Sequence, residues 1–158
     1  MSIQKSTQLP VCIGAARKGD VRTQFAALCY RMKGEKVQVL LVTSRGSRRW
    51  IIPNGWPIDG LTPAQSAARE AFEEAGVTGR VHELCLGVFS YAKYVDRSTG
   101  LPCLAMVYPL RVKSLGTDYP ERGERRRKWF SRKKAAQRIA EPELAHMILN
   151  FDPRRFGG

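Results

Sequence analysis

The stretch AAREAFEEAGV, residues 67–77, places three glutamates within five positions of a chain that carries 27 Lys and Arg against 14 Asp and Glu. The residues around it predict a helix. Thr62 suits the N-cap, Pro63 the first helical position and Gln65 the third position of a capping box. Gly76 is the natural stop just past the helix end.

Two sides of this helix differ in character. At about 100° per residue, one side collects small and apolar residues, namely Ala64, Ala68, Ala71, Phe72 and Ala75. Glu70, Glu73 and Glu74 fall on the opposite side and are neighbours in space. We therefore expect the helix to lie close on a sheet through its small residues, with its carboxylates turned away.

The crowding of Glu70, Glu73 and Glu74 is unfavourable by itself. Like charges at this spacing repel, and the last turn of a helix disfavours negative charge. Arg69 offsets only part of this. A solvated acidic face is the ordinary explanation, but a local rule broken without compensation favours a functional site. Carboxylate oxygens suit Mg²⁺ or Mn²⁺, which would bridge them to a polyanionic substrate.

Composition limits the class of protein. The 158 residues suit one domain, and the net charge of +13 favours anionic partners. No stretch approaches the roughly 18 apolar residues of a membrane span, so we expect a soluble, cytoplasmic protein without a membrane partner. The cysteines lack a CxxC pair, which favours free structural thiols over zinc or disulfides at Cys12, Cys29, Cys85 and Cys103.

The order of apolar runs predicts the organisation of the chain. We expect a loose N-terminal segment at 1–20 and a single domain at 21–158. Strand-like runs occupy residues 24–30, 37–43, 49–53, 82–94, 101–112 and 128–130, with a turn at 31–36, a polar loop at 95–100, and helices at 131–140 and 142–151. This order predicts an α/β fold, in which a mixed sheet carries helices on its faces.

The run from Gly55 to Val77, GWPIDGLTPAQSAAREAFEEAGV, resembles the Nudix box. Its pattern is Gly, five residues, Glu, seven residues, then Arg-Glu-apolar-any-Glu-Glu-any-Gly-apolar. The matching positions are Gly55, Arg69, Glu70, Ala71, Glu73, Glu74, Gly76 and Val77. Leu61 stands where the family has its isolated Glu, and Asp59 in the same loop is a possible substitute.

The resemblance implies a Nudix-type α/β/α sandwich with a loop–helix–loop motif and the hydrolysis of a phosphoanhydride. It also implies that the Gly55 carbonyl, Glu70, Glu73 and Glu74 hold Mg²⁺ or Mn²⁺. Arg69 would pair with Glu73 and orient it, and Glu70 would deprotonate or position the attacking water. A later carboxylate often contributes in this family, and here either Glu121 or Glu124 could serve.

Outside the box, the chain is similar to the diphosphoinositol polyphosphate phosphohydrolase branch. The similarity lies in LCYR, VLLVTSRGSRRWIIPNG and GERRRKWF, and it implies that substrate phosphates contact Arg22, Ser44, Arg45, Arg49 and Arg126. Taken alone, each arginine is better explained as a surface charge, but together with the glutamate helix the cluster favours phosphate binding. Gln24 stands where the branch has a basic residue. Trp50 and Trp56 could stack a base or serve as packing residues.

The expected partner is therefore a polyanionic phosphorylated small molecule, such as a diphosphoinositol polyphosphate or a dinucleoside polyphosphate. The alternative is a Nudix-fold module that binds RNA or polyphosphate with little hydrolase activity. Leu61 and the net charge of +13 favour this alternative. The presence of all three glutamates, and the lack of a recognised RNA-binding motif, favour the enzyme.

Overall fold

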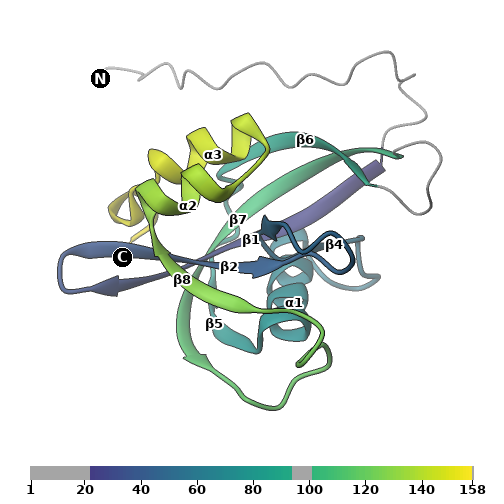
Figure 1. The fold of residues 1–158 in the computed structure, drawn as a ribbon, viewed down its shortest axis with the longest axis horizontal. Helices are drawn as coiled ribbons and strands as arrows, with labels where there is room; N and C mark the ends of the chain where they lie inside the picture. The colour runs from purple at the N-terminus through teal and green to yellow at the C-terminus, as the bar shows by residue number, and fades with distance from the viewer. Residues whose placement is uncertain (1–21, 94–100, 158) are drawn as a thin grey trace.

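The computed structural model describes residues 22–93 and 101–157. Our expectations for the segment 1–20, the loop 95–100 and Cys12 lie outside these residues. Figure 1 shows a strongly twisted sheet with one helix on one side and two helices on the other. The predicted α/β/α sandwich is confirmed.

Eight strands in the described residues form one sheet. They are β1 (Arg22–Lys33), β2 (Lys36–Thr43), β3 (Trp50–Ile51), β4 (Asn54–Gly55), β5 (Val77–Val81), β6 (Gly87–Lys93), β7 (Leu101–Leu115) and β8 (Arg127–Ser131). The main order is β3-β2-β1-β7-β5, while β4 pairs with β1, β6 with β7 and β8 with β2. Because β1 and β7 run parallel and the other pairs antiparallel, the predicted mixed sheet is confirmed.

Three details of the strands differ from the sequence-based prediction. The expected turn at 31–36 shrinks to Gly34 and Glu35, because residues 31–33 and 36 continue the β1–β2 hairpin, and Gly34 has a φ of 63°. The short strands β4 and β5 carry no long apolar run and were not predicted. The strand expected from residue 82 begins at Gly87.

Helix α1 (Pro63–Ala75) begins and ends as its sequence predicts. The Thr62 hydroxyl accepts a hydrogen bond from the Gln65 N–H at 3.1 Å, and the Gln65 side chain accepts one from the Thr62 N–H at 3.0 Å. Gly76 adopts the left-handed conformation with a φ of 67°. The capping box and the C-terminal stop are therefore confirmed.

The buried side of α1 matches the prediction only in part: Ala64, Ala71 and Ala75 are buried as expected, whereas Phe72 and Glu74 are not where the sequence placed them. Its buried residues are Ala64, Ser66, Ala67, Ala71, Glu74 and Ala75. Phe72, expected in the core, is 36% exposed, whereas Glu74, expected to face away from the sheet, is only 5% exposed. Small side chains let the helix lie close to Ala27 and Cys29 of β1, which leaves no room for a phenyl ring.

The opposite face of the sheet is covered by α2 (Arg132–Arg138) and α3 (Pro142–Leu149), followed by the 3₁₀ helix Pro153–Phe156. Their apolar residues pack on Leu28, Tyr30 and Phe130. Cys29 and Cys103 are buried free thiols and Cys85 is a half-buried one, as expected. No helix in the described residues is long and apolar enough to cross a membrane.

Candidate active site

Strand β4 brings Gly55 against the side chain of Glu70. A Cβ added to Gly55 would lie 2.3 Å from Cδ and 2.4 Å from Oε1 of Glu70. Any side chain at this position would therefore displace the carboxyl group of Glu70. This contact joins the first position of the motif to the first of its three glutamates.

Glu74 lies one turn further along α1 and is held by two partners. The Asn54 N–H donates to its Oε2 at 3.1 Å, and Nη2 of Arg125 lies 3.2 Å from its Oε1. Burial raises the pKa of Glu74 to about 8; Arg125 and the Asn54 N–H oppose this rise, and the charges of Glu70 and Glu121 add to it.

Arg125 is a site residue that the sequence-based reasoning missed. Its side chain is 8% exposed and contacts Glu74. It also donates from Nε and Nη2 to Oε1 of Glu121, at 3.2 and 3.1 Å, and from Nη1 to the Thr43 carbonyl at 3.1 Å. The sequence carries no signal that singles it out, because Arg125 is the first of three consecutive arginines and lies before β8 begins.

The loop before β8 forms a hydrogen bond with the backbone of Glu73. The Glu121 N–H donates to the Glu73 carbonyl oxygen at 2.9 Å. Of the two later carboxylates considered, Glu121 bonds to Arg125 beside the helix, whereas Glu124 is 48% exposed and contacts Arg45 at 3.7 Å. The expected pairing of Arg69 with Glu73 is absent from the ion pairs of the described residues, and Arg69 is exposed.

The donor chemistry fits a hard divalent cation. Carboxylate and carbonyl oxygens are the ligands that Mg²⁺ and Mn²⁺ prefer, and Gly55 leaves space for the carboxyl group of Glu70 beside the backbone. In residues 22–93 and 101–157, however, no three acidic, histidine or cysteine side chains already converge as a metal cluster. The preformed part of the site is the Gly55–Glu70 contact, while Glu74 is engaged by Arg125.

A pocket of about 1,240 Å³ adjoins this site. One part of the pocket wall is formed by Ser44 and by the cationic side chains of Arg45 and Arg49. Glu74 and Arg125 also line the pocket. Further wall residues are Phe89, Ser90, Tyr91, Glu141 and Leu144. Gly55, Glu70 and Glu73 are not among the lining residues, so the expected metal ligands meet the pocket at Glu74.

The loop after β2 holds its polar groups in place. The Ser44 hydroxyl accepts from the Arg49 N–H at 3.0 Å and lies 2.7 Å from the Ser47 hydroxyl. Arg45 contacts Glu121 at 3.6 Å, and Arg49 contacts Glu141 at 3.6 Å. The side chains of Arg45 and Arg49 are 62% and 50% exposed, so an anionic ligand can reach them.

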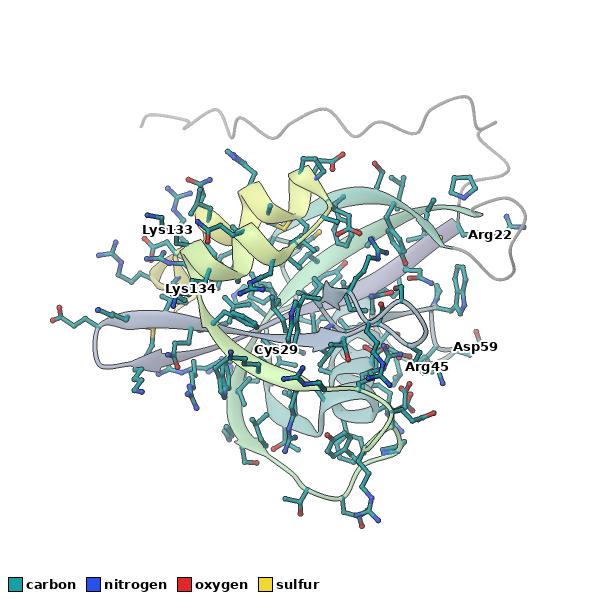
Figure 2. All side chains as sticks on the ribbon, viewed as in Figure 1. Arg22, Cys29, Arg45, Asp59, Lys133 and Lys134 are labelled. Carbon is teal, nitrogen blue, oxygen red and sulfur yellow. The ribbon has the colours of Figure 1, made fainter. Side chains whose placement is uncertain are left out.

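Arg22 and Arg126, the other two expected phosphate contacts, do not line the pocket. Arg22 begins β1 three residues before Phe25, which pairs with Gly55, and Figure 2 shows it at the end of the strand away from the β1–β2 hairpin. Arg126 is exposed; its N–H donates to the Thr43 hydroxyl at 2.9 Å, and its guanidinium lies 6.0 Å from the Trp50 ring. Strand alternation turns it to the side opposite Arg125.

The two tryptophans near the motif have different surroundings. Trp50 packs edge-on against Phe130 at 5.1 Å and is half-buried, which makes it a packing residue. Trp56 is 40% exposed. The motif departure Leu61 is half-buried in the loop before α1, and its N–H donates to the Ile58 carbonyl at 3.1 Å. Asp59 is exposed at the edge of the molecule (Figure 2).

A neutral polar network supports β4 from the pocket side. The Tyr91 hydroxyl donates to Oε1 of Gln24 and to Oδ1 of Asn54, at 3.2 Å for the latter, and Asn54 in turn holds Glu74. Gln24 is fully buried. Burial, followed by Cys103, raises the pKa of Tyr91, so its hydroxyl stays protonated. Gln24 thus stabilises the wall rather than lining the pocket.

Comparison with known proteins agrees with this geometry. The family model for the NUDIX domain matches residues 21–151. Nudix hydrolase 12, mitochondrial, of Arabidopsis thaliana is 36% identical over 106 residues, which cover 65% of this chain and 52% of the relative. Diphosphoinositol polyphosphate phosphohydrolase 3-alpha of Homo sapiens is 36% identical over 111 residues, which cover 69% and 63%.

Among solved structures, a NUDIX hydrolase from Nitrosomonas europaea has a TM-score of 0.61 at 20% identity and covers 81% of this chain and 85% of that one. At this identity the likeness concerns the fold. The chain spans about half to 63% of the length of the two curated relatives. Since the domain match covers most of the chain and the sheet and motif helix agree with it, the chain belongs to the Nudix family.

Proposed function

We propose that this protein is a phosphohydrolase that cleaves a phosphoanhydride bond in a highly phosphorylated small molecule, with Mg²⁺ or Mn²⁺ as cofactor. One observation carries the proposal. The buried carboxyl group of Glu74 and the exposed guanidinium groups of Arg45 and Arg49 line the same pocket. A cation and a polyphosphate would meet there. The human relative named a diphosphoinositol polyphosphate phosphohydrolase supports this class of substrate.

Gly55, Glu70, Glu73 and Glu74 are the proposed cation ligands. A bound cation would neutralise charge on the phosphoryl oxygens and lower the pKa of a water ligand. Glu70, beside Gly55, would position or deprotonate the attacking water. Arg125 rather than Arg69 would keep the carboxylates in place.

Ser44, Arg45 and Arg49 are the proposed phosphate contacts. Each arginine has a carboxylate neighbour at 3.6 Å, but at least half of its side-chain surface is exposed, so a phosphate can replace water around it. The proposed substrates are diphosphoinositol polyphosphates and dinucleoside polyphosphates, because these carry several phosphates. Arg22 and Arg126 would reach only parts of a substrate that extend beyond the pocket.

The test is a screen of both substrate classes with Mg²⁺ or Mn²⁺, in which phosphate release is measured. We expect turnover that a chelator abolishes reversibly, and that Glu73→Gln or Glu74→Gln removes almost completely. Glu35→Gln, an exposed change at the β1–β2 turn, serves as the control and should retain full activity. Full turnover with chelator present would contradict the proposal.

A binding module with little activity is the second candidate, because Leu61 replaces the isolated Glu of the motif. In that case the wild type would be inert in the screen, and Leu61→Glu would restore turnover. An active wild type, with only a modest change in Leu61→Glu, would exclude this candidate. We also propose a cytoplasmic location, which imaging of a tagged protein would check, since two Arabidopsis relatives are named mitochondrial.

A further inference from the structure

The α1 side of the sheet is left partly open where β2 lies between β8 and β1. Along β8, Phe130 is buried beneath the opposite helices, whereas Trp129 is only half-buried and Ser131 is exposed. On the neighbouring strands, Lys33 and Lys36 are exposed, and Arg31 and Gln38 are partly exposed. We call the five residues Arg31, Lys33, Lys36, Gln38 and Trp129 the Trp129 surface.

The pairing of the strands places these residues on one face. Arg31 pairs with Gln38 and Lys33 with Lys36, and directly paired residues point to the same side of a sheet. Two contacts fix the centre of the surface. The Arg31 guanidinium lies 4.2 Å above the Trp129 ring, and its Nε donates to Oε1 of Gln38 at 2.9 Å.

The charge of the Trp129 surface is not neutralised as it is at the pocket. Near the pocket, Arg45, Arg49 and Arg125 all contact carboxylates. In the described residues, neither Lys33 nor Lys36 takes part in an ion pair. Glu35 in the turn between the two lysines is the exposed carboxylate nearest to them in the chain, so the surface keeps a net positive charge that attracts a polyanion.

The Trp129 surface lies apart from the candidate active site. Both ends of β2 are involved: Lys36 begins the strand, and Ser44, which lines the pocket, follows its last residue. Eight steps of about 3.3 Å separate them by about 26 Å. The two lysines of the surface therefore lie outside the pocket, while Trp129 pairs with Leu40, four residues before Ser44.

We propose that the Trp129 surface binds single-stranded nucleic acid. Lys33 and Lys36 contact successive backbone phosphates, and a base stacks on the outer plane of the Arg31 guanidinium, which Trp129 and Gln38 hold flat. A charged surface alone would also suit an acidic membrane. The fixed stack of Arg31 on Trp129 favours a nucleic acid, because a membrane needs inserted apolar side chains, and Trp129 packs against the core.

Binding of the full chain to a fluorescently labelled 20-nucleotide RNA, measured by anisotropy over a series of salt concentrations, tests the proposal. Lys33→Gln with Lys36→Gln should weaken binding and reduce the slope of log K against log salt by about 1.4, since each phosphate contact on a single strand contributes about 0.7. Arg31→Gln should weaken binding by about fivefold to a hundredfold, as loss of one stacked base does.

The matched control is Lys133→Gln with Lys134→Gln, which removes the same charge from exposed positions of α2 on the other side of the sheet (Figure 2). It should change the slope much less, and all variants should keep the thermal stability and phosphate release of the wild type. Three results would overturn the proposal: no RNA binding at low salt, equal losses in the two double variants, or equally strong binding to phosphatidylserine vesicles.

Discussion

The carboxyl group of Glu70 occupies the space that a methyl group on Gly55 would fill, since a Cβ on Gly55 would lie 2.3 Å from Cδ of Glu70. The flexible end of Glu70 can move aside, and Gly55 is not among the glycines with positive φ. We therefore expect Gly55→Ala to change the melting temperature by only about 2 °C. Turnover should fall about a hundredfold, because the carboxyl group is displaced from the site.

Gly79 provides the control for that prediction. A Cβ there would lie 2.1 Å from the carbonyl oxygen of Arg111, which is backbone and cannot move aside. Gly79→Ala should cost about 1–3 kcal/mol of stability, as overpacking does, and should leave the turnover of the folded enzyme unchanged. Thermal unfolding and phosphate-release assays on both variants check this. A large loss of stability in Gly55→Ala with normal turnover would contradict our account of the site.

Arg125 and Arg126 are adjacent but should behave very differently. Arg125→Ala leaves the buried carboxyl group of Glu74 without its cation and removes one of the two arginine partners of the half-buried Glu121, and breaking a buried pair in this way costs about 3–5 kcal/mol. Arg126→Ala removes an exposed side chain and should cost less than about 0.5 kcal/mol. Chemical denaturation of the two variants measures this difference, and similar losses would show that Arg125 does not hold the carboxylates.

Helix α1 depends on its first turn, where Thr62 accepts from the Gln65 N–H at 3.1 Å and donates to Glu83 at 3.2 Å. Thr62→Ala removes both hydrogen bonds and should lower the free energy of unfolding by about 0.5–2 kcal/mol. Thr62→Ser retains the hydroxyl group and should restore most of it. Urea unfolding of the three proteins checks this prediction, and equal losses in both variants would exclude a capping role.

The ends of α1 were predictable from the sequence and its buried side only in part, for a physical reason. Capping depends on residues next to each other in the chain, so Thr62, Gln65 and Gly76 are sufficient. The buried side depends on what the sheet presents. Arg125, distant in sequence, makes burial of Glu74 tolerable, and the close approach of β1 excludes Phe72. Neither constraint is visible within the helix.

For the remaining elements and the site as well, features set by residues close in sequence were predictable, and features set by residues distant in sequence were not. Long apolar runs predicted β1, β2 and β7, whereas the two residues of β4 have no signal beyond the motif glycine itself. Resemblance named Ser44, Arg45 and Arg49, which the fold brings to the pocket. Arg125 remained hidden among three consecutive arginines, because only the direction of each side chain distinguishes them.

The molecule carries a net charge of +13, so the substrate could be recruited either by particular side chains in the pocket or by the overall positive charge. The described carboxylates in ion pairs, apart from Asp152, belong to α1, the loop before β8 and the start of α3. Figure 2 shows Arg45 and Lys133 on different sides of the fold. For a substrate held in the pocket, positive charge elsewhere therefore adds attraction at long range without a direct contact.

Substituting one cationic side chain at a time separates local contacts in the pocket from the general attraction of the net charge. Arg45→Ala or Arg49→Ala removes a guanidinium that lines the pocket, and a charge-assisted contact to phosphate is worth about 1.5–3 kcal/mol. We expect kcat/KM for a polyphosphorylated substrate to fall at least about tenfold. Lys133→Ala removes the same charge far from the pocket, where screening over a Debye length of about 8 Å leaves less than a twofold effect. Arg126→Ala should resemble Lys133→Ala, because Arg126 does not line the pocket. Steady-state kinetics at 0.15 M salt compare the four variants, and equal losses in all of them would mean that bulk charge recruits the substrate.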